Sequence, residues 1–151
     1  LHDALPILYM SYEEKINQSF QRRMGYLKMN EVQGKFRVVT EGSLKEVIAR
    51  LKKPKSPKFI IIDSFQVAGW DYPQAVELME TFPKKCFIWI SQEKKSQPMG
   101  GGAVRLKYIC DMKIRVVGYK AYCQGRAIGD PGSYYVVWED GIIQTSNNLP
   151  K

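Results

Sequence analysis

The stretch Phe59-Ile60-Ile61-Ile62-Asp63-Ser64 decides the fold class of this chain. Its four consecutive large apolar residues are typical of a strand buried on both faces, as the central strands of parallel sheets are. Residues 86–90 have the same character, and residues 72–82 predict a helix that starts near Pro73 and ends before Pro83. The sequence therefore predicts a strand–helix–strand unit of an α/β protein.

The flanking segments extend this unit in both directions. Ser11 has Glu14 three residues after it, which is the spacing of a capping box, and Ser43 is a favourable N-cap. The pattern predicts strands at 8–10 and 36–39, helices at 12–27, 44–51 and 104–108, and loops at 52–58 and 93–102. From Met112 onward the residues alternate, which predicts an antiparallel meander with strands at 112–122, 127–128 and 134–138, closed by Asp140-Gly141.

The expected architecture is one α/β domain over residues 8–151. A parallel sheet is sandwiched by helices and is followed by C-terminal antiparallel strands. We interpret the clustered aromatic residues near the end as core and sheet-face packing: Tyr119, Tyr122, Tyr134, Tyr135 and Trp138. The opening residues 1–7 resemble translated adapter sequence, and no Met occurs before position 10. We therefore expect a non-native leader over 1–7 and a fragment whose native beginning is missing.

Composition excludes several classes of protein. The chain has 151 residues, 44% hydrophobic and 12% aromatic, which is enough to bury a core and argues against disorder. Its apolar runs are far shorter than the ~20 residues of a membrane span, so we expect no membrane partner and a cytoplasmic location. The net charge of +8 favours polyanionic partners, namely nucleic acid, nucleotide phosphates or anionic lipid.

Cysteine and histidine usage limits the chemistry further. The three cysteines, Cys86, Cys110 and Cys123, cannot all pair and lack zinc-site spacing, so we expect buried thiols in a reducing compartment. The one histidine is His2, near the terminus. Catalysis here must therefore use carboxylates, Lys or Arg, and backbone dipoles.

Polar residues follow three of the expected strands. They are Ser11 to Glu14, Asp63-Ser64 and Ser91-Gln92. The carboxyl ends of parallel strands meet at one edge of a sheet, so these side chains are predicted to converge on one crevice. Asp63 is suited to hold the hydration shell of Mg²⁺, or to cap the following helix. Glu13 or Glu14 is suited to polarise a water, and Glu14 is better suited to capping a helix N-terminus.

The order of these segments resembles the later part of a RecA-like P-loop ATPase core. The likeness is closest to the RadA/Sms DNA-repair branch, with DnaB/KaiC-like relatives, and it covers residues 8–141. It rests on Leu8 to Glu14 followed by Gln18, Arg22 and Arg23; on Phe59 to Gln66; on Ile90 to Lys95; on Gly100 to Leu106 followed by Cys110-Asp111-Met112; and on Gln124 to Gly129.

The resemblance implies ATP and Mg²⁺ as cofactors and assigns roles to particular residues. Glu13 matches the catalytic glutamate, Asp63 with Ser64 the Walker B element that binds nucleotide and Mg²⁺ through water, and Gln92 the phosphate sensor. Arg126 matches an arginine that works at a subunit interface, although Ala127 replaces the Phe of that motif. A homo-oligomeric ring or filament follows for the intact protein.

The phosphate-binding loop of this family is missing from the sequence. No G-x-x-x-x-G-K-[ST] motif occurs, and the resemblance places it upstream of Leu8. We therefore expect this chain alone to bind nucleotide poorly and to be inactive.

The loop at 93–102 is a second candidate site. Its place matches the DNA-contacting loop of RecA-type filaments, and its positive charge comes from Lys94, Lys95, Arg105 and Lys107. The implied function is an ATP-hydrolysing domain of a DNA-repair or helicase-type ATPase with single-stranded DNA as partner. The alternatives are a non-catalytic nucleic-acid-binding module, which the charge and the basic loop support equally, or an assembly module on the same fold. For the loop itself, the alternative is a solvated basic loop with nothing bound.

Overall fold

The computed structural model describes residues 6–124 and 132–142. The chain divides into two compact units, Leu1–Leu106 and Lys107–Lys151. Each unit is described by itself.

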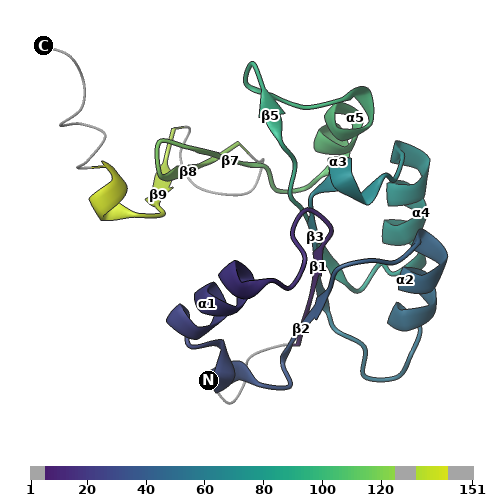
Figure 1. The fold of residues 1–151 in the computed structure, drawn as a ribbon. Helices are drawn as coiled ribbons and strands as arrows, with labels where there is room; N and C mark the ends of the chain where they lie inside the picture. Colours follow the sequence, from purple (N-terminus) through teal and green to yellow (C-terminus); the bar gives the residue numbers. More distant parts are fainter. Residues whose placement is uncertain (1–5, 125–131, 143–151) are drawn as a thin grey trace, which may run out of the picture. The chain divides into compact units, whose positions relative to one another are not determined.

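The first unit is built on a four-stranded parallel sheet with the strand order β2-β1-β3-β4 (Figure 1). Its strands are β1 (Ile7–Ser11), β2 (Phe36–Val39), β3 (Phe59–Asp63) and β4 (Cys86–Trp89). The strand β3 pairs with β1 on one side and with β4 on the other, so the stretch that decided the fold class is a central parallel strand. The predicted α/β class with a parallel sheet is confirmed.

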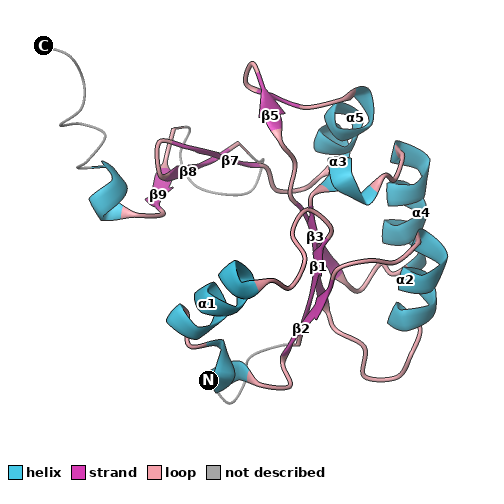
Figure 2. Ribbon diagram, in the orientation of Figure 1, coloured by secondary structure: helices cyan, strands magenta, loops and turns pink. Residues whose placement is uncertain are grey.

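Helices lie on both sides of this sheet. Figure 2 shows α2 and α4 on one side and α1 on the other. The helices are α1 (Gln18–Tyr26), η1 (Met29–Val32), α2 (Leu44–Leu51), α3 (Phe65–Ala68), α4 (Tyr72–Thr81) and α5 (Gly101–Ile109), the last of which crosses the boundary between the units. Capping boxes begin α2 at Ser43 and α4 at Asp71, where an acceptor side chain satisfies an amide that the helix leaves unpaired.

The predicted helix over 12–27 begins later than its capping-box spacing indicated. It starts at Gln18, where the Asn17 side chain accepts a hydrogen bond of 2.8 Å from the Phe20 N–H. Ser11 remains in β1, and its hydroxyl donates to the Glu14 carbonyl instead. The next two amides, of Tyr12 and Glu13, both donate to the carbonyl of Asp63, which ties this segment to the end of β3.

One face of the sheet holds the core. Leu8, Met10, Ile60 and Ile62 lie side by side on that face and are at most 1% exposed. They are joined by buried residues of the covering helices: Val47 and Leu51 of α2, and Ala75 and Leu78 of α4. Burial at this face supplies most of the hydrophobic stabilisation of the unit.

The other face is only partly covered, and this corrects the prediction for residues 86–90. The strand β4 lies at the edge of the sheet, and Cys86 on its outer face is exposed. Ile88 on the same face is 43% exposed. Only the alternate residues, Phe87 and Trp89, pack against aromatic neighbours on the covered face. The cause is incomplete cover of this face, because Phe59 and Ile61 of β3 on the same face are also only partly buried although β3 has a strand on each side.

The segment predicted as a loop at 93–102 contains a hairpin. Its strands are β5 (Glu93–Lys94) and β6 (Gln97–Pro98), and Lys95 and Ser96 connect them with φ angles of 52° and 63°. Positive φ at both central residues is what a two-residue hairpin turn of type I′ requires. The following helix, α5, is longer than the predicted 104–108.

The second unit contains a three-stranded antiparallel sheet with the order β7-β8-β9. Its strands are β7 (Ile114–Val117), β8 (Lys120–Cys123) and β9 (Tyr134–Val136). The predicted strand over 112–122 is in fact a hairpin, because Gly118 and Tyr119 turn the chain with positive φ. Residues 139–142 are helical, and the predicted strand at 127–128 lies outside the described residues.

The aromatic residues of this unit pair with one another but do not form a buried core. Tyr119 packs edge-on against Trp138 at 5.0 Å between ring centroids, and Tyr122 lies 5.5 Å from Tyr134. Tyr135 is 75% exposed and Tyr134 is 51% exposed. A sheet of three short strands covers too little surface to bury them, so the core interpretation is wrong for these residues.

Two further expectations concern cysteines and membranes. All three cysteines are free thiols, but Cys86 is exposed and the other two are partly exposed, so the expectation of buried thiols is wrong. Over residues 6–124 and 132–142, no helix has the length and apolar character needed to cross a bilayer.

Candidate functional site

The carboxyl ends of β1, β3 and β4 bring the predicted carboxylates together. Ser11 pairs in register with Asp63. Beyond it, the amides of Tyr12 and Glu13 donate to the Asp63 carbonyl at 2.7 and 3.1 Å. This double contact fixes the backbone of Glu13 beside the end of β3. The two candidate carboxylates therefore belong to one edge of the sheet.

Gln92 reaches the same edge from the segment that follows β4. Its Nε2 donates a hydrogen bond of 3.0 Å to Oε1 of Glu13 across 79 positions of sequence. The Glu13 side chain is exposed, so water can reach its carboxylate. The structure thus brings Glu13, Asp63 and Gln92 to one place.

Glu14 points to a different partner. Its carboxylate forms an ion pair with Arg23 of α1. The helix-capping role predicted for Glu14 is wrong, because the helix begins at Gln18. Of the two candidate bases, Glu13 is the one that contacts the other site residues.

Asp63 is held by a residue that the sequence analysis missed. The Tyr9 hydroxyl donates a short hydrogen bond to Oδ2 of Asp63. Burial, the hydrogen bond to Asp63 and the negative charge of Asp63 together raise the pKa of Tyr9 to about 12, with burial the largest cause. The signal in the sequence was the strand period: Tyr9 lies two residues before Ser11 and shares its face of the sheet.

Ser64 follows Asp63 through a cis peptide bond. It is 1% exposed, and its hydroxyl has no hydrogen-bond partner among the described residues. Ser64 is therefore buried beneath the edge and is not presented on it.

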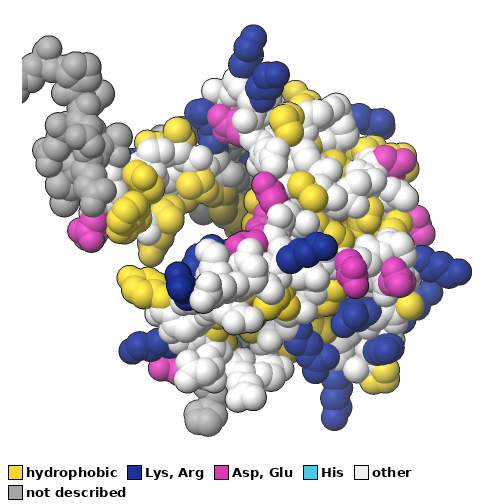
Figure 3. All heavy atoms as spheres, viewed as in Figure 1, with side chains coloured by type: hydrophobic (Ala, Val, Ile, Leu, Met, Phe, Trp, Pro, Cys, Tyr) yellow, Lys and Arg dark blue, Asp and Glu magenta, His cyan; other side chains and the backbone are white. Residues whose placement is uncertain are grey.

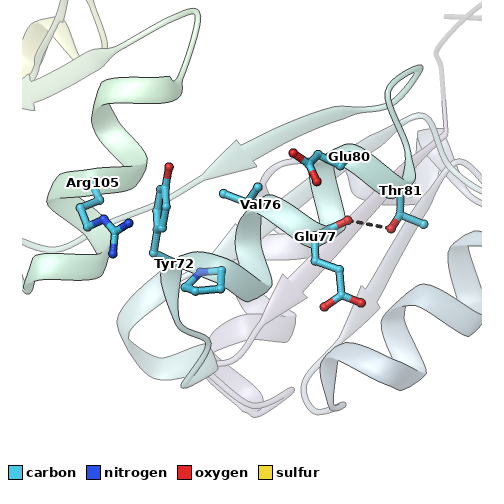
Figure 4. Close-up of a pocket in the computed structure, with 7 residues that line it drawn as sticks. Tyr72, Val76, Glu77, Glu80, Thr81 and Arg105 are labelled. Carbon is cyan, nitrogen blue, oxygen red and sulfur yellow. Dashed lines mark hydrogen bonds between the residues drawn. The ribbon is translucent and has the colours of Figure 1, made fainter.

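The predicted basic residues lie on different elements. Lys94 and Lys95 are exposed on the β5–β6 hairpin. Arg105 lies on α5, and Figure 4 shows its side chain beside that of Tyr72. The guanidinium carbon is 4.1 Å from the centre of the Tyr72 ring. Lys107 falls in the second unit, and Arg126 lies outside the described residues. In Figure 3, Lys and Arg side chains are spread over the visible surface.

Two cavities lie away from Glu13, Asp63 and Gln92. One, of about 530 Å³, runs along α4 and is lined by Tyr72, Pro73, Val76, Glu77, Glu80, Thr81 and Arg105 (Figure 4). The other, of about 660 Å³, lies between the end of β2 and the start of α2. Neither is lined by Glu13, Asp63 or Gln92. The candidate site is thus not part of either of these two cavities.

Comparison of the sequence with models of known protein families and with curated proteins gave no match.

The buried tyrosines predict a pH dependence of stability. Burial, followed by the charge of Glu46, raises the pKa of Tyr12 to about 12, as burial does for Tyr9. The neutral phenols therefore stabilise the fold fully below pH 10, and this contribution is lost as the pH rises from 10 to 12. Denaturant unfolding at several pH values between 10 and 12 should show that the free energy of unfolding falls less in Tyr9→Phe than in the native chain. Tyr135→Phe, at an exposed position, is the control, and an equal loss in both variants would contradict the assignment.

Proposed function

We propose that this chain is the later part of a RecA-like ATPase domain, and that Glu13, Asp63 and Gln92 act on Mg²⁺-ATP in the intact protein. The observation that carries the proposal is the hydrogen bond between Gln92 and Glu13 beside Asp63. A carboxylate and an amide from separate strand ends, next to a second carboxylate, suit the positioning chemistry of phosphoryl transfer.

Asp63 fits a magnesium site. Mg²⁺ is bound through one or two carboxylates together with substrate phosphates and water, and does not require a cage of protein ligands. Bound Mg²⁺ neutralises charge on the phosphates. Tyr9 would fix the orientation of the Asp63 carboxylate by holding Oδ2.

Glu13 and Gln92 would then act on the attacking water and the terminal phosphate. The Glu13 carboxylate is exposed and can accept a proton or a hydrogen bond from water. The Gln92 amide donates to Glu13 in this structure and would donate to a phosphate oxygen when nucleotide is present. Gln92 would thus change its acceptor from Glu13 to a phosphate oxygen when nucleotide binds.

The open side of the sheet supports the RecA-like part of the proposal. The connections β1–α1–β2 and β3–α4–β4 run in opposite directions across the sheet, and their helices lie on opposite sides (Figure 1). A strand paired to β4 and leading into β1 would run in the same direction as β1–α1–β2. Right-handed crossovers then put its helix on the α1 side. There Ile88 and Ile90 are 43% and 41% exposed, so an upstream strand and helix carrying the phosphate-binding loop would cover them.

The Mg²⁺ assignment is tested by replacing Asp63 with Asn in the protein extended to include the upstream segment. Addition of Mg²⁺ should raise the affinity for ATP in the native protein, and this gain should fall about tenfold or more in the variant. Glu80→Gln removes one exposed negative charge on α4 and is the matched control. Isothermal titration with and without Mg²⁺ makes the comparison, and an undiminished gain in Asp63→Asn would reject the assignment.

The exposed lysines of the hairpin support single-stranded DNA as the partner. They also favour the second candidate function, a nucleic-acid-binding module without ATP chemistry. In either case Lys94 and Lys95 would contact phosphates without reading sequence. In the ATPase proposal the intact protein works as a homo-oligomer, and Arg126 acts at the interface between subunits. A protein that binds ATP and assembles without binding DNA is the third candidate.

Removal of the hairpin charges should weaken DNA binding and its dependence on salt. Each lysine replaced, Lys94→Gln or Lys95→Gln, should lower the slope of log affinity against log salt by roughly 0.7 for a single-stranded oligonucleotide. Lys45→Gln, on the exposed side of α2, is the control. Fluorescence anisotropy at several salt concentrations measures the slope. A slope equal to that of the native chain in both hairpin variants would exclude the hairpin as the contact.

A further inference from the structure

The Gln66 side chain makes three hydrogen bonds beside the candidate site. It lies in α3, three residues after Asp63. Its Oε1 accepts a hydrogen bond of 3.1 Å from the Gln92 N–H. Its Nε2 donates to the Ser91 hydroxyl at 2.7 Å and to the Met99 carbonyl at 2.8 Å. One side chain thus holds three residues of the segment that leaves β4.

These contacts lie at the base of the β5–β6 hairpin. The Met99 N–H donates to the Gln92 carbonyl at 2.8 Å, so Gln92 and Met99 face each other where the hairpin begins and ends. The hairpin ladder consists of two residue pairs, and Pro98, which has no N–H to donate, belongs to one of them. A ladder this short is marginally stable by itself. Contacts at its base therefore help to set where the hairpin lies.

Gln92 is consequently held at two points. Gln66 holds its backbone amide, and its own side-chain amide donates to Glu13. A movement of the hairpin base moves Gln92 and so changes its contact with Glu13. Among neutral side chains only an amide offers both the acceptor and the two donors that this position uses, which explains a glutamine here.

We propose that Gln66 is a positioning residue that couples the β5–β6 hairpin to the Glu13–Gln92 contact. The coupling itself rests on the hydrogen bonds above. Its meaning, that occupancy of the hairpin adjusts the hydrolytic residues, rests on the proposed function. The experiment therefore uses neither nucleotide nor nucleic acid, so that failure of the coupling and failure of the ATPase proposal remain distinguishable.

The clamp is tested by amide hydrogen exchange of the 151-residue chain, followed by NMR. In Gln66→Met, the amides of Gln92 and Met99 should exchange at least about fivefold faster, because the bonds at the hairpin base are lost or loosened. In Gln66→Glu, the acceptor remains but the donors are gone, so the Gln92 amide should stay protected while the Met99 amide exchanges faster. Gln21→Met, at an exposed position of α1, is the matched control.

A general loss of stability would give a different pattern. Two other amides serve as internal references. The Phe65 N–H donates to the Ile90 carbonyl, and the Ile90 N–H donates to the Ile62 carbonyl. They should exchange as in the native chain in every variant. Two results would overturn the proposed role of Gln66. One is that the reference amides exchange faster by the same factor as the Gln92 amide, and the other is that exchange at Gln92 is unchanged in Gln66→Met.

The coupling is tested by a double substitution. Lys95→Gly relaxes the positive-φ turn of the hairpin and should shift the side-chain amide resonances of Gln92. In the Gln66→Met background, the same substitution should shift them by less than about half as much. An equal shift in both backgrounds would show that Gln66 does not transmit the change and would overturn the proposal.

Discussion

Replacement of Glu13 by Gln should reduce ATP hydrolysis by the upstream-extended protein by about 10²-fold or more, while ATP binding is retained. The substitution keeps the size of the side chain and the acceptor oxygen for Gln92, whose Nε2 donates to Oε1 of Glu13 at 3.0 Å. It removes the negative charge that draws a proton from water. Steady-state turnover together with equilibrium nucleotide binding separates the two effects.

Glu14→Gln is the matched control for this prediction. Glu14 is the neighbouring carboxylate, but it pairs with Arg23 and does not contact Gln92. Its replacement should leave turnover within a few-fold of the native rate. If Glu14→Gln abolished turnover and Glu13→Gln did not, the base would be Glu14, and the arrangement at the sheet edge would have been misassigned.

The second large effect concerns stability and the unequal faces of the sheet. Ile60→Ala should lower the free energy of unfolding by about 2–5 kcal/mol, because Ile60 is 0% exposed and its removal leaves a cavity in the core. Ile88→Ala, in the neighbouring strand but on the open face and 43% exposed, should cost less than about 1 kcal/mol. Denaturant unfolding of the two variants measures the difference.

The same pair of variants tests whether the proposed upstream strand and helix cover the open face of the sheet. In the extended protein, a helix over the open face would bury Ile88, so Ile88→Ala should become more costly, and Ile60→Ala should cost about the same. Equal costs for the two substitutions in the present chain would contradict the description of an open face. An unchanged cost for Ile88→Ala in the extended protein would place the upstream segment elsewhere.

Local signals predicted the elements whose causes are local. The helix at 44–51 is observed with those bounds, because Ser43 and Glu46 form its capping box within four residues of sequence. Ser11 and Glu14 have the same spacing and did not start a helix. The Ser11 hydroxyl donates to the Glu14 carbonyl, and the amides of Tyr12 and Glu13 tie the segment to the carbonyl of Asp63. That carbonyl is distant in sequence, so the spacing gives no sign of it.

Burial depends on neighbours that a strand's own sequence does not specify. The apolar run at 86–90 resembles that at 59–62, yet Ile88 of β4 is exposed and Ile61 of β3 is only partly buried, because that face of the sheet is incompletely covered. The hairpin at 93–98 could not be predicted from its turn. The turn residues with positive φ are Lys95 and Ser96, and not the usual Asn and Gly.

For the site, the rule that parallel strands end at one edge predicted that Glu13, Asp63 and Gln92 would meet. It could not predict which side chains hold them. Tyr9 and Gln66 act through contacts across 54 and 26 positions, and neither belongs to a residue type that signals catalysis by itself. Nor did the sequence predict that the guanidinium of Arg105 lies over the ring of Tyr72.

The central claim is that the sheet edge formed by Glu13, Asp63 and Gln92 belongs to an ATP-hydrolysing site. Its most direct test is the turnover of ATP by the native protein extended to include the upstream segment, measured with Mg²⁺ and with or without single-stranded DNA. The account predicts hydrolysis that requires Mg²⁺. Binding of DNA with no hydrolysis under either condition would contradict it and would favour a nucleic-acid-binding module on the same α/β scaffold.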